Sequence, residues 1–165
     1  MMEREAALRA IPTPTDVAPL GFVALYRDQY DPMVRLAALL VDRPEVAEEI
    51  VQDAFAIAFE RWDHMDAPVA YVRTVVVNRC RDVLRRRRVA AAASFGRVQE
   101  STEPSGDLLH DALATLSPRQ RAVLVLRFYE DLSNDEVARL LKMRPGTVKS
   151  LVHRGLSTLR EVVER

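Results

Sequence analysis

The sequence predicts an all-α protein in which a flexible linker joins two small helical domains. Two observations carry this prediction: helix-start signals recur along the 165 residues, and apolar residues recur at three- and four-residue spacing. Sustained apolar–polar alternation is missing and glycine occurs only five times, which argues against a β-rich fold. We expect helices over residues 19–30, 32–41, 44–62, 67–88, 107–115, 118–130, 133–141 and 145–163.

Prolines and capping residues predict where these helices begin. Asp31 followed by Pro32 has the pattern of a cap and a first-turn proline, so we expect a break between the first two helices. Ser133 and Glu136 have the spacing of a capping box, in which each side chain accepts a hydrogen bond from the other residue's amide. Later helices open on prolines, namely Pro44, Pro68 and Pro118.

The segments 44–62 and 67–88 supply the core of the first predicted domain, residues 19–89, which follows an N-terminal tail of residues 1–18. Burial of each large apolar side chain contributes roughly 1.5–3 kcal/mol. Cys80 lies in the apolar stripe, which favours a buried hydrophobe over a reactive thiol. The two stripes consist of Val46, Ala47, Ile50, Val51, Ala54, Phe55, Ala58, Phe59 and Trp62, and of Val69, Val72, Val76, Cys80, Val83 and Leu84.

Residues 90–106 are rich in alanine, serine and glycine and offer little to a core, so we interpret them as a flexible linker. About 18 residues reach roughly 60 Å when fully extended. The second domain is then 107–165, which is small enough to be only marginally stable alone.

Composition excludes several classes of protein. One cysteine cannot form an internal disulfide, and three scattered histidines do not make a metal-ligand set. No apolar run approaches the roughly 18 to 20 residues that span a bilayer, and early charges followed by prolines argue against a signal peptide. A glycine-rich phosphate loop and a nucleophile–base spacing are also missing. We therefore expect a cytoplasmic protein that is not an enzyme and that takes no cofactor and no small-molecule substrate.

A net charge of zero hides four alternating blocks. Residues 1–70 carry −7, residues 71–98 carry +7, residues 99–136 carry −5 and residues 137–165 carry +5. Alternation of this kind is typical of a chain with two separate surfaces that meet a polyanion, although solvated helix faces give the same pattern.

Residues 133–160 have the proportions of a helix-turn-helix. A capped helix ends at a short break over residues 142–144, and a second helix opens at Pro145. A recognition helix needs hydrogen-bond donors at its N-terminal end, where the helix dipole also favours phosphate. The apolar residues that would hold the helix pair are Val137, Leu140, Leu141, Val148, Leu151, Val152, Leu156 and Leu159. The outward residues predicted to bind DNA are Arg144, Thr147, Lys149, Ser150, His153 and Arg154.

Two sets of sequence strings resemble one family. PRQRAVLVLRFYEDLS at 118–133, EVA at 136–138 and PGTVKS at 145–150 resemble region 4 of bacterial sigma factors, above all the extracytoplasmic-function (ECF) group of the sigma-70 superfamily. Region 2 of the same group is resembled by FVALY at 22–26, AEEIVQDAF at 47–55, WD at 62–63, YVRTVVVN at 71–78 and RD at 81–82. The resemblance covers about 20–88 and 107–162, in family order.

The resemblance implies an RNA polymerase sigma factor that recognises promoters and melts DNA. Its implied partners are promoter DNA, the β′ clamp helices and β flap of core RNA polymerase, and an anti-sigma factor. The extended linker also matches about 17 base pairs at roughly 3.4 Å per step. The acidic helix face that would dock on the clamp helices consists of Glu48, Glu49, Gln52 and Asp53.

Residues 63–66 align with the loop that captures a base turned out of the −10 duplex, and the next helix faces the exposed strand. The implied −10 residues are Asp63, His64, Met65, Asp66, Tyr71, Arg73, Asn78, Arg81 and Arg85. Residues 144–154 align with the −35 reader. The chain departs from the family pattern at several positions. Many relatives have tryptophan at the position of Tyr71. Relatives often have glycine in place of Lys142, serine or threonine in place of Arg144, and arginine in place of Leu151.

Two alternatives stay open at this point. A helix-turn-helix regulator with a LuxR-like output domain and a helical N-terminal interaction domain has a similar Thr-Val-Lys string, although residues 20–88 lack the βαβ pattern of a receiver. Locally, His64 and the run Arg85–Arg88 have the alternative interpretation of solvated side chains.

Overall fold

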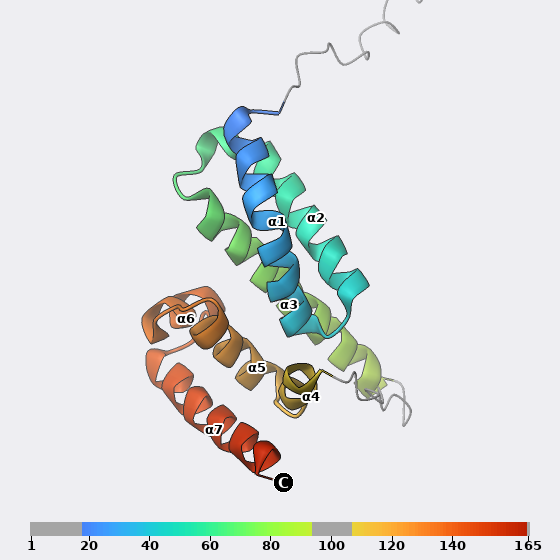
Figure 1. Ribbon diagram of the computed structural model, residues 1–165, viewed down its shortest axis with the longest axis vertical. Coiled ribbons are helices and arrows are strands. Elements are labelled where there is room, and N and C mark those ends of the chain that lie inside the picture. The colour runs from blue at the N-terminus through green and yellow to red at the C-terminus, as the bar shows by residue number, and fades with distance from the viewer. Residues whose placement is uncertain (1–17, 94–106, 165) are drawn as a thin grey trace, which may run out of the picture.

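The computed structural model describes residues 18–93 and 107–164 and confirms the all-α class, with no strand among those residues. Three long helices form one body: α1 (Leu20–Val41), α2 (Pro44–Glu60) and α3 (Pro68–Ala93). Four further helices form a second body, which packs against one end of the first (Figure 1). These are α4 (Leu108–Ala114), α5 (Pro118–Leu124), α6 (Asn134–Leu141) and α7 (Pro145–Val163).

The predicted break at Pro32 is wrong, because α1 runs through the proline without interruption. Phe22 and Leu25 before the proline, and Met33 and Leu36 after it, are all buried. A proline inside a helix costs about 3 kcal/mol. Burial of one continuous apolar face on α2 and α3 offsets that cost, so tertiary packing overrides the local signal.

The core of the first body contains most of both predicted stripes, from Ala47 to Ala58 in α2 and from Val72 to Cys80 in α3. The helix α2 ends two residues earlier than expected, and residues Trp62–His64 form a 3₁₀ turn. In the other direction α3 continues to Ala93, so residues 90–93 at the start of the predicted linker are helical, and residues 94–106 lie outside the described part.

The second body contains three short helices, α4 to α6, and the longer α7. The short helices begin on strong local signals. Ser117 with Gln120, and Ser133 with Glu136, form complete capping boxes at the starts of α5 and α6. The expected single helix over 118–130 divides, because a π-helical turn over Val125–Tyr129 follows α5. Such turns insert one extra residue per turn and occur frequently at functional sites.

Close packing of α5 against α7 fixes the helix-turn-helix. Gly155 is buried, and a Cβ at that position would lie 2.8 Å from Leu124 Cδ1. Leu156, which we expected in the core, is exposed instead, whereas Val148 and Leu151 are buried as predicted. The turn between α6 and α7 begins at Lys142, whose φ of 53° lies in the left-handed region that favours glycine.

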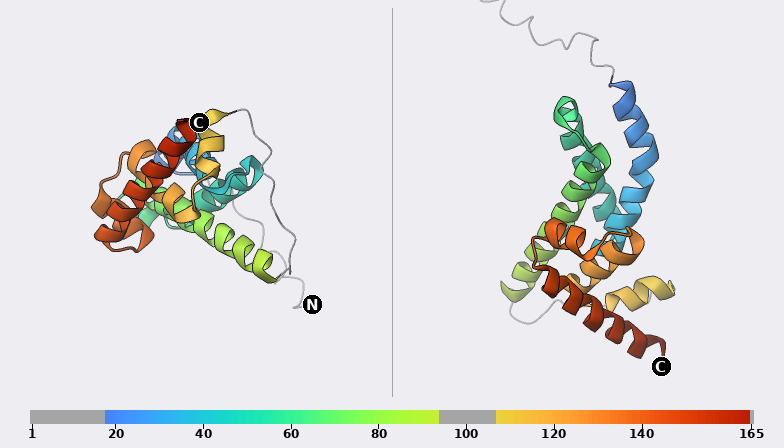
Figure 2. Two further views of the ribbon diagram at one scale, coloured as in Figure 1. Left: turned by 90° about the horizontal axis from the view of Figure 1, so that it is seen from below. Right: turned by 90° about the vertical axis from the view of Figure 1, so that its left-hand side faces the viewer.

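The two bodies meet along α1 and α3 (Figure 2). Two clusters of charged side chains cross the boundary. Arg73 of α3 pairs with Glu130 of the second body at 2.6 Å. Asp42, just after α1, contacts His110 Nε2 and lies 3.8 Å from Arg121 Nη1. Within the described ranges, no helix is long and apolar enough to cross a membrane.

Candidate nucleic-acid interface

The outer face of α7 is open and cationic. Lys149, Ser150, His153 and Arg154 line a shallow hollow of about 560 Å³ together with Gly146. The Ser150 hydroxyl donates to the Gly146 carbonyl at 3.0 Å, so only its lone pairs remain to accept from a ligand. Lys149 forms no ion pair among residues 18–93 and 107–164, and its ammonium is exposed. The face combines fixed donors with acceptors, as a reader of base edges and phosphate requires.

The start of α7 has an unusual N-cap. Arg144 occupies the cap with φ −75° and ψ 142°, and it makes no side-chain capping hydrogen bond. Pro145 follows at the first helical position, where the missing amide hydrogen costs nothing. The Thr147 N–H donates to the Arg144 carbonyl at 2.9 Å, so the first turn is partly paired within the backbone. Arg144 adds an exposed cationic residue at the positive end of the helix dipole, where an anion such as phosphate is favoured. Thr147, in the same first turn, is exposed.

The loop after α2 is anchored by an aromatic cluster. Trp62 packs edge-on against Phe22, with ring centroids 5.6 Å apart. Gly21 permits this contact, since a Cβ there would lie 2.9 Å from Trp62 Cζ2. The loop is therefore held to the end of the first body that is remote from α4–α7 (Figure 1).

The same loop forms one wall of a pocket of about 710 Å³. The pocket brings together His64, Met65, Asp66 and Tyr71 of the predicted −10 set, whereas Asp63 is not among its lining residues. An aromatic ring, a thioether and a carboxylate in one hollow offer a stacking surface and a hydrogen-bond acceptor for a flipped base. Sequence reasoning missed several lining residues, which flank the loop directly: Glu60, Arg61, Ala67, Ala70 and Thr74.

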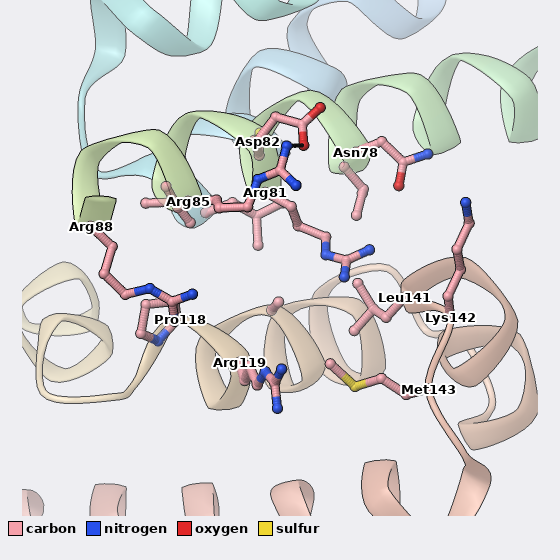
Figure 3. A pocket seen from close by; sticks show the side chains of 15 residues that line it. Asn78, Arg81, Asp82, Arg85, Arg88, Pro118, Arg119, Leu141, Lys142 and Met143 are labelled. Atoms are coloured by element: carbon pink, nitrogen blue, oxygen red, sulfur yellow. Dashed lines mark hydrogen bonds and ion pairs between the residues drawn. The ribbon is translucent and has the colours of Figure 1, made fainter. Parts of the chain in front are cut away.

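The predicted strand-binding residues of α3 divide into two places. Asn78, Arg81 and Arg85 line a cleft of about 640 Å³ between α3 and the second body (Figure 3). Arg85 also pairs with Asp82 at 3.1 Å. Arg73 is separate from this cleft and is engaged by Glu130. Arg73, Asn78 and Arg81 are thus partly covered at the second body. The Arg85 side chain lines the same cleft but is 66% exposed to solvent.

The acidic face of α2 is fully exposed, and Figure 1 shows α2 on the side of the bundle away from α6 and α7. Glu48 and Glu49 are surface residues. Asp53 pairs with Arg79 of α3 at 3.2 Å, and Gln52 Nε2 donates to the Tyr30 hydroxyl at 3.5 Å. An exposed ion pair of this type contributes about 0–1 kcal/mol, so exchange for an external cation costs little.

The thiol of Cys80 is buried in the core of the first body. Burial raises the pKa of the Cys80 thiol to about 12, so the thiol stays protonated at neutral pH. No cluster of three or more potential metal ligands occurs within residues 18–93 and 107–164. The arrangement is suited to binding.

Comparison with known proteins gives two family matches in the order of the chain. Residues 25–89 match the family described as Sigma-70 region 2. Residues 106–159 match the family described as Sigma-70, region 4.

Several relatives are similar over most of their length. The RNA polymerase sigma-E factor of Streptomyces antibioticus is 38% identical over 154 residues, which cover 88% of this chain and 86% of that protein. The ECF RNA polymerase sigma factor SigL of Mycobacterium tuberculosis is 31% identical over 160 residues, covering 83% and 85%. The sigma factor RpoE of Bartonella quintana, solved with the anti-sigma factor NepR, has the same fold. That match has a TM-score of 0.71 at 24% identity and covers 87% of this chain and 97% of that one.

Proposed function

The chain belongs to the ECF group of the sigma-70 family, and we propose that it binds core RNA polymerase and directs promoter recognition and DNA melting. The observation that carries the proposal is that the chain matches sigma regions 2 and 4 in the family's order. Each region also has polar residues that are exposed or line a cleft. The regulator with a LuxR-like output domain is the weaker alternative, because residues 25–89 match sigma region 2. We keep the division into region 2 (19–89), linker (90–106) and region 4 (107–165) as a prediction.

Polymerase binding is assigned to the acidic face of α2, namely Glu48, Glu49, Gln52 and Asp53. Complementary charge toward the β′ clamp helices speeds association and fixes the docking orientation. On binding, the Asp53 carboxylate would give up its ion pair with Arg79 and form one with a cationic side chain of the polymerase. A second contact, between region 4 and the β flap, is expected from the family alone.

Recognition of the −10 element is assigned to the loop pocket and to α3. Unstacking a base costs a few kcal/mol, which contacts in the pocket and along the strand have to recover. Asp63, His64, Met65, Asp66 and Tyr71 supply the pocket and its rim. The strand backbone is assigned to Arg73, Asn78, Arg81 and Arg85.

Recognition of the −35 element is assigned to α7, whose N-terminal half would lie in the major groove. Its side chains divide by chemistry into phosphate contacts and base contacts. The proposed phosphate contacts are Arg144, Lys149 and Arg154. The proposed base contacts are Thr147, Ser150 and His153.

Two further expectations depend on this function. The Bartonella relative was solved with an anti-sigma factor, and we propose a partner of this class here. Bacterial promoters and polymerase lie in the cytoplasm, which is where the proposed activity would place the protein.

Run-off transcription with purified core polymerase tests the proposal. We expect the wild-type chain to initiate at discrete promoters and Asp53→Arg to abolish the transcripts. Asp28→Arg, an equal charge change on the exposed surface of α1, is the matched control and should retain them. Silence of wild-type protein on every genomic template would overturn the proposal. Dimeric binding to palindromic DNA without polymerase would favour the regulator.

A further inference from the structure

The DNA-facing side of α3 and the second body are in direct contact. We propose that region 4 competes with promoter DNA for region 2: in the free protein it binds the strand-facing side of α3, and Glu130 occupies the place of a strand phosphate on Arg73. The identity of Arg73 as a strand contact rests on the proposed function. The contact between the two regions rests on the geometry.

The Arg73–Glu130 pair has the features of a specific contact. Its Nε–Oε2 distance is 2.6 Å, and only 23% of the Arg73 side chain and 10% of the Glu130 side chain are exposed. Charge-assisted hydrogen bonds of this kind are among the strongest in proteins, and guanidinium binds carboxylate and phosphate by the same geometry. Removal of either partner leaves a poorly solvated charge, so the pair favours the closed arrangement.

The fold of region 4 directs Glu130 outward from its own body. Glu130 terminates the π-helical turn, where its backbone N–H donates to the Val125 carbonyl at 3.2 Å. Asp131 then adopts φ 53°, which turns the chain toward α6. Among the described residues, the one side-chain bond of Glu130 goes to Arg73 of region 2.

A second contact fixes the orientation of the two regions. Asp42 has φ 65° after the last turn of α1, where its N–H donates to the Ala38 carbonyl at 3.1 Å. Its carboxylate contacts His110 and lies near Arg121. Arg121 is 8% exposed and is held in place by donation from Nε to the Leu113 carbonyl at 2.9 Å. Two separated contacts prevent free rotation about either one.

The space between these contacts makes the arrangement reversible. Arg81 of α3 lines the cleft together with Arg119 and Lys142 of region 4, and Asp82 is the one carboxylate in its lining (Figure 3). Like charges that share a cleft repel one another. Region 4 is therefore held at two points and repelled between them, so a polyanion such as melted DNA can displace it.

A distance measurement on the free full-length chain tests the closure. Cysteines introduced at exposed Ala56 of α2 and exposed Arg160 of α7 carry the donor and acceptor dyes. The buried Cys80 thiol, whose pKa is raised to about 12, should remain unlabelled. We expect a short distance in the wild type and a longer one in Glu130→Gln. Glu161→Gln makes the same charge change in region 4 away from the contact and should leave the distance unchanged.

Affinity for DNA tests the competition in the same variants. The probe is a single-stranded oligonucleotide from the non-template −10 strand of a promoter mapped by run-off transcription. Glu130→Gln should bind it about fivefold more tightly than either the wild type or Glu161→Gln, because less of the chain is closed. A double variant, Arg73→Glu with Glu130→Arg, reverses the ion pair. It should restore the short distance between the two dyes and should not bind the oligonucleotide more tightly than the wild type.

The outcomes separate this inference from the proposed function. An equal distance in wild type and Glu130→Gln overturns the closure. A longer distance without tighter DNA binding overturns the competition. A chain that closes as expected but supports no transcription overturns the proposed function, which the distance measurement does not require.

Discussion

The two faces proposed to read DNA are presented differently by the same chain. The face of α7 that contains Lys149 and Arg154 is open, with no part of region 2 among its lining residues. The side of α3 that contains Arg73 and Arg81 faces region 4. The proposed −35 reader is therefore accessible in the free protein, whereas access to the proposed strand-binding side of α3 requires the two regions to separate. This difference gives promoter binding an order, with duplex contacts before single-strand contacts.

The two regions also owe their stability to different interactions. Region 2 depends on long helices and an aromatic cluster, in which Phe22 contacts Phe55, Phe59 and Trp62 edge-on. Region 4 has three short helices and the longer α7, two capping boxes and one close helix–helix contact at Gly155. Single substitutions at caps or at that contact should therefore disable the −35 reader and leave region 2 folded.

The largest expected effect is that of Gly155→Val, which should destabilise region 4 while region 2 stays folded. A branched side chain would overlap Leu124, whose Cδ1 already lies 2.8 Å from the Cβ position. Overpacking of this kind costs about 2 kcal/mol, more than the helix propensity recovers. Urea unfolding of the full chain should show an earlier transition for region 4 alone.

Gly146→Ala is the matched control for that substitution. Nothing lies within 4 Å of the Cβ position of Gly146, so the added methyl group meets open space. We expect its unfolding midpoint to equal or exceed that of the wild type. Equal midpoints for Gly155→Val and wild type would show that α5 and α7 do not pack closely.

Lys149→Ala tests DNA binding by the exposed face of α7. Loss of one phosphate contact should weaken binding to −35 duplex DNA about fivefold and reduce the slope of log affinity against log salt by about one. Titration at several salt concentrations measures both quantities. Arg160→Ala removes an equal charge from the far end of α7 and should keep the wild-type slope. An unchanged slope for Lys149→Ala would remove this residue from the phosphate contacts.

Sequence patterns predicted the parts of the fold that depend on local signals. The capping box at Ser133, the helix start at Pro118 and the apolar stripe of α2 are read directly from residue spacing. The capping box at Ser117 was not predicted. The break expected at Pro32 failed because packing on both sides of the proline outweighs its local cost. The π-helical turn after Leu124 was missed, since its sequence continues a regular helical pattern.

The residues of the candidate site could likewise be predicted only in part from the sequence. Lys149, Ser150, His153 and Arg154 line one hollow on α7, whereas Arg144 and Thr147 are not among its lining residues. Four of the predicted loop residues line the loop pocket. Their roles in DNA binding stay predictions. The partners Glu130 and Asp42 were not predicted, because each is an ordinary acidic residue whose role depends on a region distant in sequence. Pairings of this kind have no periodicity or motif, and three-dimensional packing alone brings them together.

Ser133→Ala is a smaller test of how region 4 depends on its caps. The Ser133 hydroxyl accepts from the Glu136 amide at 3.2 Å, and loss of an N-cap costs about 1 kcal/mol. Urea unfolding should again resolve the loss in region 4. Ser157→Ala is the control, because that hydroxyl only donates to the His153 carbonyl within a helix, where alanine is tolerated. Equal losses in both variants would contradict a specific capping role.

The smallest expected effect concerns the reciprocal half of the same box. The pKa of the Glu136 carboxyl is lowered, first by the hydrogen bond from the Ser133 amide and then by the Ser133 side chain. A carboxyl whose pKa is lower in the folded state stabilises the fold above its unfolded pKa, and this contribution disappears as the pH falls through the folded pKa. Gln fits the same capping position but does not titrate. In urea unfolding between pH 3 and pH 7, Glu136→Gln should flatten the acid side of the stability profile of region 4. Glu161→Gln should retain the wild-type slope, so parallel profiles for all three proteins would exclude the capping contact as the source of the pH dependence.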